Sequence, residues 1–476
     1  MSQIHKTDLC IIGAGSGGLS VASAAVQMGA NVTLIEQHKI GGDCLNYGCV
    51  PSKALIAAAK HAQLIKNSPA FGIRTTDFSI DHQALHGHIH ERINHIAPHD
   101  SIERFENLGV NVILGTGKFT SPNSVLVNDS KIHARRFIIA TGSKAAIPNI
   151  PGLESAPYFT NETIFDLTHA PDHLVVIGGG PIGLEIACAY AHLDIKVTLI
   201  ARSNILAKED KELVELIRNH LKNKLTILEN TAINKISYND INNVANIHLK
   251  NDNDVSIEAS HLLIATGRAP ALHTLNLSTA NINYNNEGIL VDNRLCTSNK
   301  KVYVIGDVIG KEQFTHAANY HAGIVIRNIL FHLPAKASAL IPRATFTLPE
   351  IAHIGLTEQQ ARQQYGDKIQ CLNWPFARND RAITDRQTNG LVKVIANKKG
   401  KILGAGIVHE HASDLLTPWM LAINNNLTIK SIAGLVHPYP TLGEANKYAA
   451  GSFYTPKLFS NRMKSIIKLL MKINRY

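Results

Sequence analysis

The chain has 476 residues, enough for about three domains at roughly 150 residues each. Its hydrophobic fraction of 45% and charged fraction of 18% are typical of a globular protein, and no apolar run is long enough to span a bilayer. The net charge is +10, but no basic segment is interleaved with stacking aromatic residues, which argues against nucleic-acid binding. Because the N-terminus lacks a signal-peptide pattern, we expect a cytoplasmic protein.

The first element is a short apolar strand at residues 9–12, which leads into a glycine-rich turn and a helix of small residues. The turn contains Gly13, Gly15 and Gly18. A second strand at 32–36 ends in Glu36, at about the 20-residue spacing of the acid that binds a ribose in Rossmann units. Glycines let the backbone approach a pyrophosphate at the helix N-terminus, so this segment predicts a dinucleotide site.

The next segment, residues 41–53, contains the close cysteine pair Cys44 and Cys49. A disulfide needs Cα atoms about 4.4–6.8 Å apart, whereas five residues of regular helix rise about 7.5 Å. We therefore expect a turn at Asn46 and Gly48 and a helix that starts near Cys49, whose N-terminus would favour the thiolate. No nearby Cys/His set completes four zinc ligands, so the pair predicts redox chemistry and no metal site.

The strand–glycine–helix pattern occurs a second time, from a strand at 174–177 to another strand at 197–201. Its glycines are Gly178, Gly180 and Gly183. The second strand ends in Ala-Arg-Ser, so Arg202 stands where an NAD site would carry an acid, and Lys208 follows six residues later. Since Arg pairs with a 2′-phosphate that a carboxylate would repel, we predict NADPH, with NADH as the alternative. The competing interpretation is that Arg202 is a solvated surface residue.

Residues 301–307 read as a buried strand ending in the turn Gly306-Asp307, and the sequence from about residue 341 looks like a separate α+β domain. Alternating strands and helices predict an α/β fold. It consists of two Rossmann-like dinucleotide-binding domains plus a C-terminal α+β domain.

The cysteine motif at 41–53 strongly resembles that of the class I pyridine nucleotide-disulfide oxidoreductases: dihydrolipoamide dehydrogenase, glutathione reductase and mercuric reductase. The resemblance extends over nearly the whole chain. Its other motifs are Ala140-Thr141-Gly142, Ala265-Thr266-Gly267, Gly306-Asp307, Pro349-Glu350 and Gly355-Leu356-Thr357-Glu358. The resemblance implies that the first loop binds FAD, that Lys53 pairs with Glu185 beside the flavin, and that Asp307 hydrogen-bonds the ribityl chain.

The resemblance also implies domain boundaries and a homodimer with shared active sites. We predict an FAD-binding domain from residues 1–150 and 271–338, an NAD(P)-binding domain at 151–270, and a dimerisation domain at 339–476.

The chain departs from the lipoamide and glutathione enzymes in residues 437–444. Those enzymes place an acid/base histidine five residues before the glutamate, which is Glu444 here, and this chain has Tyr439 at that position. His437, two residues earlier, is the competing candidate. Mercuric reductase is similar in both this tyrosine and the Ala-Arg-Ser strand end. It delivers metal through a C-terminal cysteine pair, however, and this chain has no cysteine after Cys371.

Residues 458–476 predict a basic amphipathic helix. We favour a helix packed on the dimer, and the alternative is peripheral contact with an anionic membrane.

Together these features predict an enzyme that passes electrons from NADPH through FAD and the Cys44–Cys49 disulfide to a small-molecule acceptor, in the manner of mercuric reductase. The alternatives are a dihydrolipoamide dehydrogenase, against which Tyr439 and Arg202 argue, and a non-enzymatic flavin-bearing redox sensor. A sensor needs no hydride donor, so the presence of both nucleotide loops argues against it.

Overall fold

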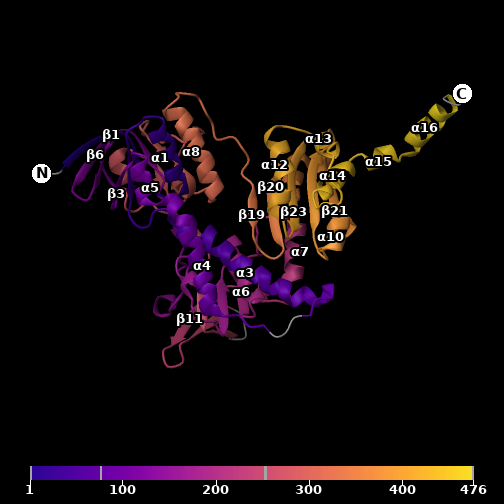
Figure 1. Cartoon of the computed structure of the whole chain (residues 1–476), viewed down its shortest axis with the longest axis horizontal. Coiled ribbons are helices and arrows are strands. Elements are labelled where there is room, and N and C mark those ends of the chain that lie inside the picture. Colours follow the sequence, from indigo (N-terminus) through magenta and orange to yellow (C-terminus); the bar gives the residue numbers. More distant parts are fainter. Residues whose placement is uncertain (1–2, 75–77, 251–254, 474–476) are drawn as a thin grey trace. The chain divides into compact units, whose positions relative to one another are not determined.

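The computed structural model describes residues 3–74, 78–250 and 255–473, which form two compact units (Figure 1). The first unit comprises Met1–Arg202 and Ile227–Ser338, and the second comprises Ser203–Thr226 and Ala339–Tyr476. Residues 203–226 thus pack with the C-terminal part of the chain, although the sequence places them in the predicted NAD(P)-binding domain. Both nucleotide-binding regions fall in the first unit, so this division does not separate an FAD-binding domain from an NAD(P)-binding domain. The boundaries between those domains stay a prediction.

The larger sheet of the first unit has seven strands in the order β3-β2-β1-β6-β5-β4, with β18 beside β6. They are β1 (Gln3–Ile12), β2 (Val32–Glu36), β3 (Asn111–Leu114), β4 (Lys118–Ser121), β5 (Ser124–Val127), β6 (Ser130–Ile139) and β18 (Val302–Val304). The strands β3, β2, β1, β6 and β18 run parallel to one another, so their carboxyl ends share one edge, where ligands bind in open α/β sheets. Helices α1 (Ser16–Gln27) and α8 (Thr315–Ile329) pack against each other and contribute to one hydrophobic core.

The smaller sheet has the order β10-β9-β8-β14, in which β9, β8 and β14 run parallel. Its strands are β8 (His173–Ile177), β9 (Lys196–Ile200), β10 (Thr226–Leu228) and β14 (His261–Ile264). An antiparallel sheet of β11 (Ile233–Asn239), β12 (Val244–Leu249) and β13 (Ser256–Ala259) shares its core. Both strand–glycine–helix patterns are therefore confirmed, and the second is completed by helix α6 (Pro181–His192).

Helices α2 (Gly42–Asn46), α3 (Cys49–Asn67) and α4 (His82–Ile96) follow the first Rossmann pattern, and α3 packs against both α4 and α6. The remaining elements of the first unit are short. They are α5 (Ile102–Asn107), β7 (Ser143–Ala145), β15 (Arg268–Pro270), β16 (Tyr284–Asn285) and β17 (Gly288–Ile289).

The second unit has a five-stranded antiparallel sheet in the order β19-β20-β23-β22-β21, as expected for an α+β domain. Its strands are β19 (Arg343–Thr345), β20 (Glu350–Gly355), β21 (Ile369–Pro375), β22 (Leu391–Asn397) and β23 (Ile402–His409). Its helices are α7 (Lys211–Leu221), α9 (Glu358–Tyr365), α10 (Asp380–Thr384), α11 (Ala412–Leu415), α12 (Thr417–Asn424), α13 (Ile429–Ala433) and α14 (Glu444–Gly451). Trp419 is fully buried in the core, where its indole nitrogen donates to Asn446 Oδ1 at 2.7 Å.

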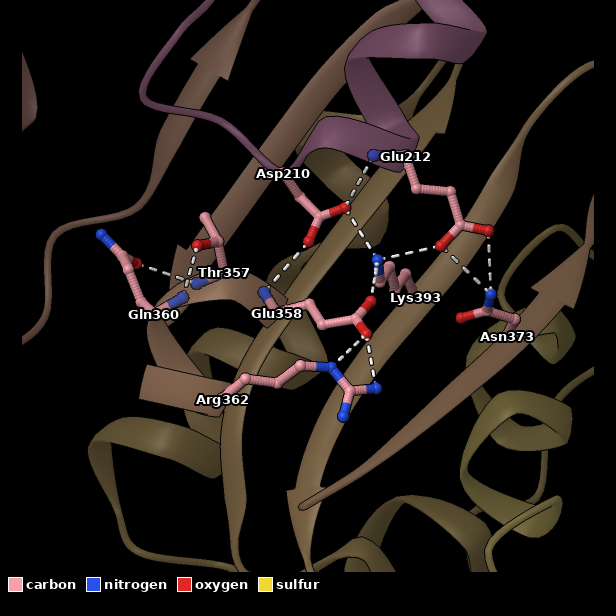
Figure 2. Close-up of polar contacts among 8 residues, drawn as sticks. All are labelled: Asp210, Glu212, Thr357, Glu358, Gln360, Arg362, Asn373 and Lys393. Carbon is pink, nitrogen blue, oxygen red and sulfur yellow. Dashed lines mark hydrogen bonds and ion pairs between the residues drawn. The ribbon is translucent and has the colours of Figure 1, made fainter. Parts of the chain in front are cut away.

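A buried lysine joins α7 to the sheet and to α9 (Figure 2). The Nζ of Lys393, on β22, lies 2.8 Å from Asp210 Oδ1, 2.9 Å from Glu212 Oε2 and 2.7 Å from Glu358 Oε2. Only 3% of the Lys393 side chain is exposed. Burial disfavours the charged form of Lys393 and acts to lower its pKa. The hydrogen bonds that Lys393 donates to the three carboxylates outweigh this effect, so the pKa of Lys393 is raised. Arg362, whose side chain is half exposed, pairs with Glu358. This Lys393 cluster therefore holds residues 203–226 in the second unit.

The C-terminal segment contains two helices, α15 (Thr455–Leu458) and α16 (Asn461–Ile473), so the prediction of one helix from residue 458 is wrong at its start. The Oγ of Ser460 accepts a hydrogen bond from the backbone N–H of Met463, which begins a new helix after the break. None of the α16 residues is buried, and residues 474–476 lie outside the described part. Within the described residues, every helix is too short or too polar to cross a bilayer.

Candidate functional site

The two cysteines of the predicted redox pair lie where one short helix ends and a longer one begins. Cys44 is in α2, and Cys49 is the first residue of α3, which confirms the predicted helix start. Gly41 and Gly42 have left-handed φ angles of +86° and +60° at the start of α2. Near its end, Asn46 Nδ2 donates to the carbonyl oxygen of Gly42 at 2.9 Å. The break between the two helices lies at Tyr47 and Gly48, whose φ angles are −142° and −124°. The predicted turn is therefore confirmed at Gly48 and is wrong at Asn46, which is the last residue of α2.

The two thiols have different electrostatic surroundings. A hydrogen bond from Cys44, helped by Thr315 and the charge of Lys53, lowers the pKa of the Cys49 thiol to about 6, although burial acts in the opposite direction. The same hydrogen bond, together with burial, raises the pKa of Cys44. Both residues are free cysteines in this structure. At neutral pH, this arrangement leaves a thiolate on Cys49 and a proton on Cys44.

Thr315 contacts Cys49, and the charges of Lys53 and Glu185 act on it. Its Sγ lies 3.5 Å from the hydroxyl of Thr315, the first residue of α8. Sequence reasoning missed Thr315, since a threonine at a helix start is too common to indicate a site. Lys53, one turn along α3, pairs with Glu185 of α6 at 2.8 Å. This is the contact that the family resemblance implies, and its place beside a flavin stays a prediction.

The two glycine loops have the same internal geometry. A Cβ on Gly13 would lie 2.3 Å from the carbonyl oxygen of Ala140, and one on Gly178 would lie 2.1 Å from that of Ala265. A Cβ on Gly18 or Gly183 would lie 1.9 or 2.2 Å from the oxygen of the first glycine in its own loop. Protein packing therefore requires the first and third glycine of each loop.

The middle glycines, Gly15 and Gly180, require a different explanation. Both have a φ of −77°, and both cap helices whose first turn receives no side-chain hydrogen bond. A Cβ on Gly180 would meet no heavy atom within 4 Å, and one on Gly15 would meet only Gly42 Cα, at 4.0 Å. Neither backbone conformation nor packing requires glycine here, and the missing Cβ leaves room for a ligand to approach the backbone, as the pyrophosphate of a dinucleotide would. The loops thus fit two dinucleotides.

Glu36 lies at the end of β2 and is 8% exposed. Its Oε2 accepts from the backbone N–H of Ala14 at 2.7 Å, and its Oε1 accepts from that of His38 at 2.8 Å. A carboxylate oxygen has two lone pairs, so each can also accept from a ribose hydroxyl. The structure therefore places Glu36 against the first loop, and its role as a ribose ligand stays a prediction.

An arginine that sequence reasoning did not single out, Arg268, connects three turns of the first unit. Its guanidinium lies 3.2 Å from Asp43 Oδ1, beside Cys44, and 3.8 Å from Asp307 Oδ2. The Oγ of Ser143 accepts from Arg268 Nε at 2.6 Å and donates to Asp307 at 2.7 Å. Burial raises the pKa of Asp307, while Ser143 and Arg268 oppose the change. The arginine therefore links the redox motif to the Gly306-Asp307 turn.

The surrounding glycine turns also adopt conformations that need glycine. Gly142, Gly267 and Gly306 have φ angles of +69°, +140° and +72°. The hydroxyl of Thr141 donates to the carbonyl oxygen of Ala271 at 2.9 Å. These residues thus support the connections after β6, β14 and β18, and their contact with FAD stays a prediction.

The predicted coenzyme-selecting residues are both exposed. Arg202 directly follows β9 in the first unit, and Lys208 belongs to the second unit. Arg202 is therefore available to a ligand at the end of β9.

The acid/base candidates belong to the second unit. Tyr439 is 72% exposed, and its hydroxyl donates to Asp380 Oδ2 at 2.8 Å. This hydrogen bond and the charge of Asp380 raise the pKa of Tyr439. Glu444 is buried and accepts from the backbone N–H of Thr441 at 3.2 Å. The Nε2 of His437 is buried without a hydrogen-bond partner among the described residues. Sequence reasoning missed Asp380, which lies far from Tyr439 along the chain.

Two family models match the chain. Residues 7–322 match the pyridine nucleotide-disulphide oxidoreductase model, and residues 341–450 match the dimerisation domain of the same family. Mercuric reductase of Bacillus cereus is 36% identical over 94% of this chain and 72% of its own length. Dihydrolipoyl dehydrogenase of Geobacillus stearothermophilus is 33% identical over 94% of this chain and 96% of its own length.

A solved structure is also similar over nearly the whole chain. The HOCl-induced flavoprotein disulfide reductase RclA from Escherichia coli, as its Cu(II) complex, matches with a TM-score of 0.84 and 27% identity. The match covers 94% of this chain and 99% of the other. The chain therefore belongs to the pyridine nucleotide-disulphide oxidoreductase family and is an FAD-dependent enzyme that uses NAD(P)H as electron donor.

Proposed function

We propose that the enzyme uses NADPH to reduce a small disulfide or other thiol-reactive oxidant, with Cys44 as the exchanging thiol and Cys49 as the thiolate beside the flavin. The observation that carries this proposal is the difference between the two thiols: the pKa of Cys49 is lowered to about 6, whereas that of Cys44 is raised. Bound FAD and NADPH supply the hydride chemistry that reduces the Cys44–Cys49 disulfide to this dithiol.

The chain's own residues then carry out thiol–disulfide exchange. Once its proton is removed, Cys44 attacks one sulfur of a disulfide substrate and releases the other as a thiol, which leaves a mixed disulfide. The Cys49 thiolate attacks the Cys44 sulfur, so the Cys44–Cys49 disulfide re-forms and the second substrate thiolate leaves. The substrate thus gains two electrons and the one proton that Cys44 carried, and the second thiolate takes its proton from water. Because the pKa of Cys44 is raised, the first step needs a base.

Tyr439 is poorly suited to be that base. Its hydroxyl already donates to Asp380, which raises the pKa of Tyr439 and keeps it protonated at neutral pH. A protonated tyrosine can instead donate a hydrogen bond or a proton to an acceptor. A protonated Tyr439 favours an electron acceptor whose reduction needs no strong base. It argues against a dihydrolipoamide dehydrogenase. We infer that residues 437–444 act in the site of a second copy in a homodimer, which the matched dimerisation domain supports.

The acid/base assignment can be tested by the steady-state rate of NADPH oxidation with disulfides, quinones and Hg²⁺ as acceptors. Tyr439→His should raise disulfide turnover, because imidazole is suited to neutral pH, and should leave flavin reduction by NADPH unchanged. Tyr439→Phe should lower turnover of the native acceptor if the hydroxyl donates a proton. If His437→Ala abolishes disulfide turnover while Tyr439→Phe has no effect, His437 is the base and a lipoamide-type enzyme is the better description.

Coenzyme choice gives a separate prediction. Arg202→Glu should weaken NADPH binding by several-fold or more and NADH binding far less, because it replaces attraction at the 2′-phosphate with repulsion. Gly180→Ala is the matched control: its methyl group meets open space in the protein and should weaken both coenzymes to a similar degree. The measurement is the KM for each coenzyme. Equal use of NADPH and NADH by the wild type would show that Arg202 does not contact the coenzyme.

A further inference from the structure

Helix α4, which packs against α3 and contacts α2, presents two histidines on one face. His86 and His90 are one turn apart, and their ring centroids lie 4.2 Å from each other. Ile89 and Ile93 follow each histidine by three residues and are buried, which fixes the rotation of the helix. Both histidines are half-buried at the margin of this apolar face. Their positions are thus set by the packing of the helix.

A carboxylate from a distant segment completes the group. Asp166 ends a short 3-10 turn, Ile164–Asp166, in which Ile164 and Phe165 are buried. Its Oδ1 lies 3.4 Å from His90 Nε2. One ligand atom from each of His86, His90 and Asp166 lies within 4.8 Å of the others. The Nε2 of His90 is inaccessible to solvent and has no hydrogen-bond partner among the described residues, so it is a nitrogen aimed into this group.

We propose that His86, His90 and Asp166 form a binding site for a divalent transition-metal ion of the Zn²⁺ type. Imidazole nitrogen suits zinc, copper and nickel, whereas Mg²⁺ and Ca²⁺ prefer all-oxygen sites. In a tetrahedral zinc site with bonds of about 2.0–2.1 Å, neighbouring ligand atoms lie about 3.3 Å apart, close to the His90–Asp166 distance. Asp166 is exposed, so its carboxylate can rotate to close the wider separation. Water would fill the remaining position.

The site is independent of the proposed reductase chemistry. It lies on α4 and Ile164–Asp166, and none of its three residues takes part in the proposed electron transfer. Bound metal would cross-link the helix to the turn and stabilise the folded state, because the unfolded chain does not hold the three ligands together.

The test is calorimetric titration of the oxidised holoenzyme with Zn²⁺. The oxidised form is used because the reduced Cys44–Cys49 dithiol can bind zinc by itself. We expect one ion per chain with wild-type protein, and binding at least tenfold weaker after His86→Ala, His90→Ala or Asp166→Asn. His95→Ala is the matched control: His95 is exposed on α4 on a different face from His86, so zinc affinity should not change. Flavin content and Tm of each variant check that it folds.

A Tm shift gives a second readout. Zn²⁺ should raise the Tm of the wild type and of His95→Ala but not of His86→Ala, whereas Mg²⁺ should raise none of them. The proposal is overturned if wild-type protein fails to bind Zn²⁺, or if it binds Zn²⁺ with an affinity that all three ligand variants retain. In that case the histidines form only a tilted ring pair with a surface ion pair to Asp166.

Discussion

Lys393→Ala is expected to reduce the free energy of unfolding of the second unit by about 3–5 kcal/mol, the cost of breaking a buried ion pair from one side. The substitution leaves Asp210, whose side chain is 3% exposed, without its cation and close to two other carboxylates. Lys393→Met should have nearly the same effect, because it keeps the aliphatic part of the side chain and removes only the charge. A loss below 1 kcal/mol for both variants would show that the cluster contributes little to stability.

The chain offers both a probe and a control for this measurement. Its two tryptophans, Trp374 and Trp419, both belong to the second unit, so tryptophan fluorescence during urea denaturation reports that unit. Arg362→Ala removes a cation that is half exposed and screened by water, so it should reduce the free energy of unfolding much less than Lys393→Ala does.

The effect of Lys393→Ala should also depend on pH. The hydrogen bond from Lys393 lowers the pKa of Glu358 from its usual 4.5 to about 2. Stability from this contact is therefore present above pH 4.5 and is lost as the pH falls toward about 2. The difference between wild type and Lys393→Ala should shrink over the same range.

Cys49→Ser should abolish NADPH-dependent disulfide reduction, because exchange needs both thiols, and should also remove the long-wavelength absorbance of a thiolate beside the flavin in the reduced enzyme. Cys44→Ser should also stop turnover but should retain that absorbance. If the band survives Cys49→Ser and disappears in Cys44→Ser, the roles of the two cysteines are reversed.

The pH dependence of this band makes the test sharper. A lowered pKa means that the Cys49 thiolate is present above about pH 6 and is protonated below it. The largest cause is the hydrogen bond from Cys44, so Cys44→Ala should move the midpoint to higher pH. Cys44→Ser, whose hydroxyl can still donate, should move it less.

Local signals in the sequence were sufficient for the nucleotide loops and the cysteine pair. A strand, glycines at fixed spacing and a helix are encoded within about 30 residues, and the structure has each such element at the expected place. The start of α3 at Cys49 followed from the geometric limits on a disulfide. These features depend on neighbours along the chain, which a single sequence displays directly.

The residues that sequence reasoning missed depend on contacts between distant segments. Arg268 reaches Asp43 and Asp307, and Asp380 accepts from Tyr439, across separations that leave no periodic or spacing signal. The packing of residues 203–226 with the C-terminal unit was hidden for the same reason, because Asp210 and Lys393 look like ordinary surface charges until the fold pairs them.

Because residues 203–226 pack in the second unit, that unit cannot finish folding until the C-terminal part of the chain has been synthesised. Helix α7 emerges from the ribosome long before the strands that it packs on. Its apolar residues Leu213 and Ile217, which are buried in the folded protein, stay exposed until β20 and β23 have been made. A fragment that starts at residue 339 would lack the carboxylates of Asp210 and Glu212, and one that stops before residue 339 would expose the apolar face of α7. Neither fragment should therefore fold stably when it is expressed alone. The two fragments expressed together are expected to associate.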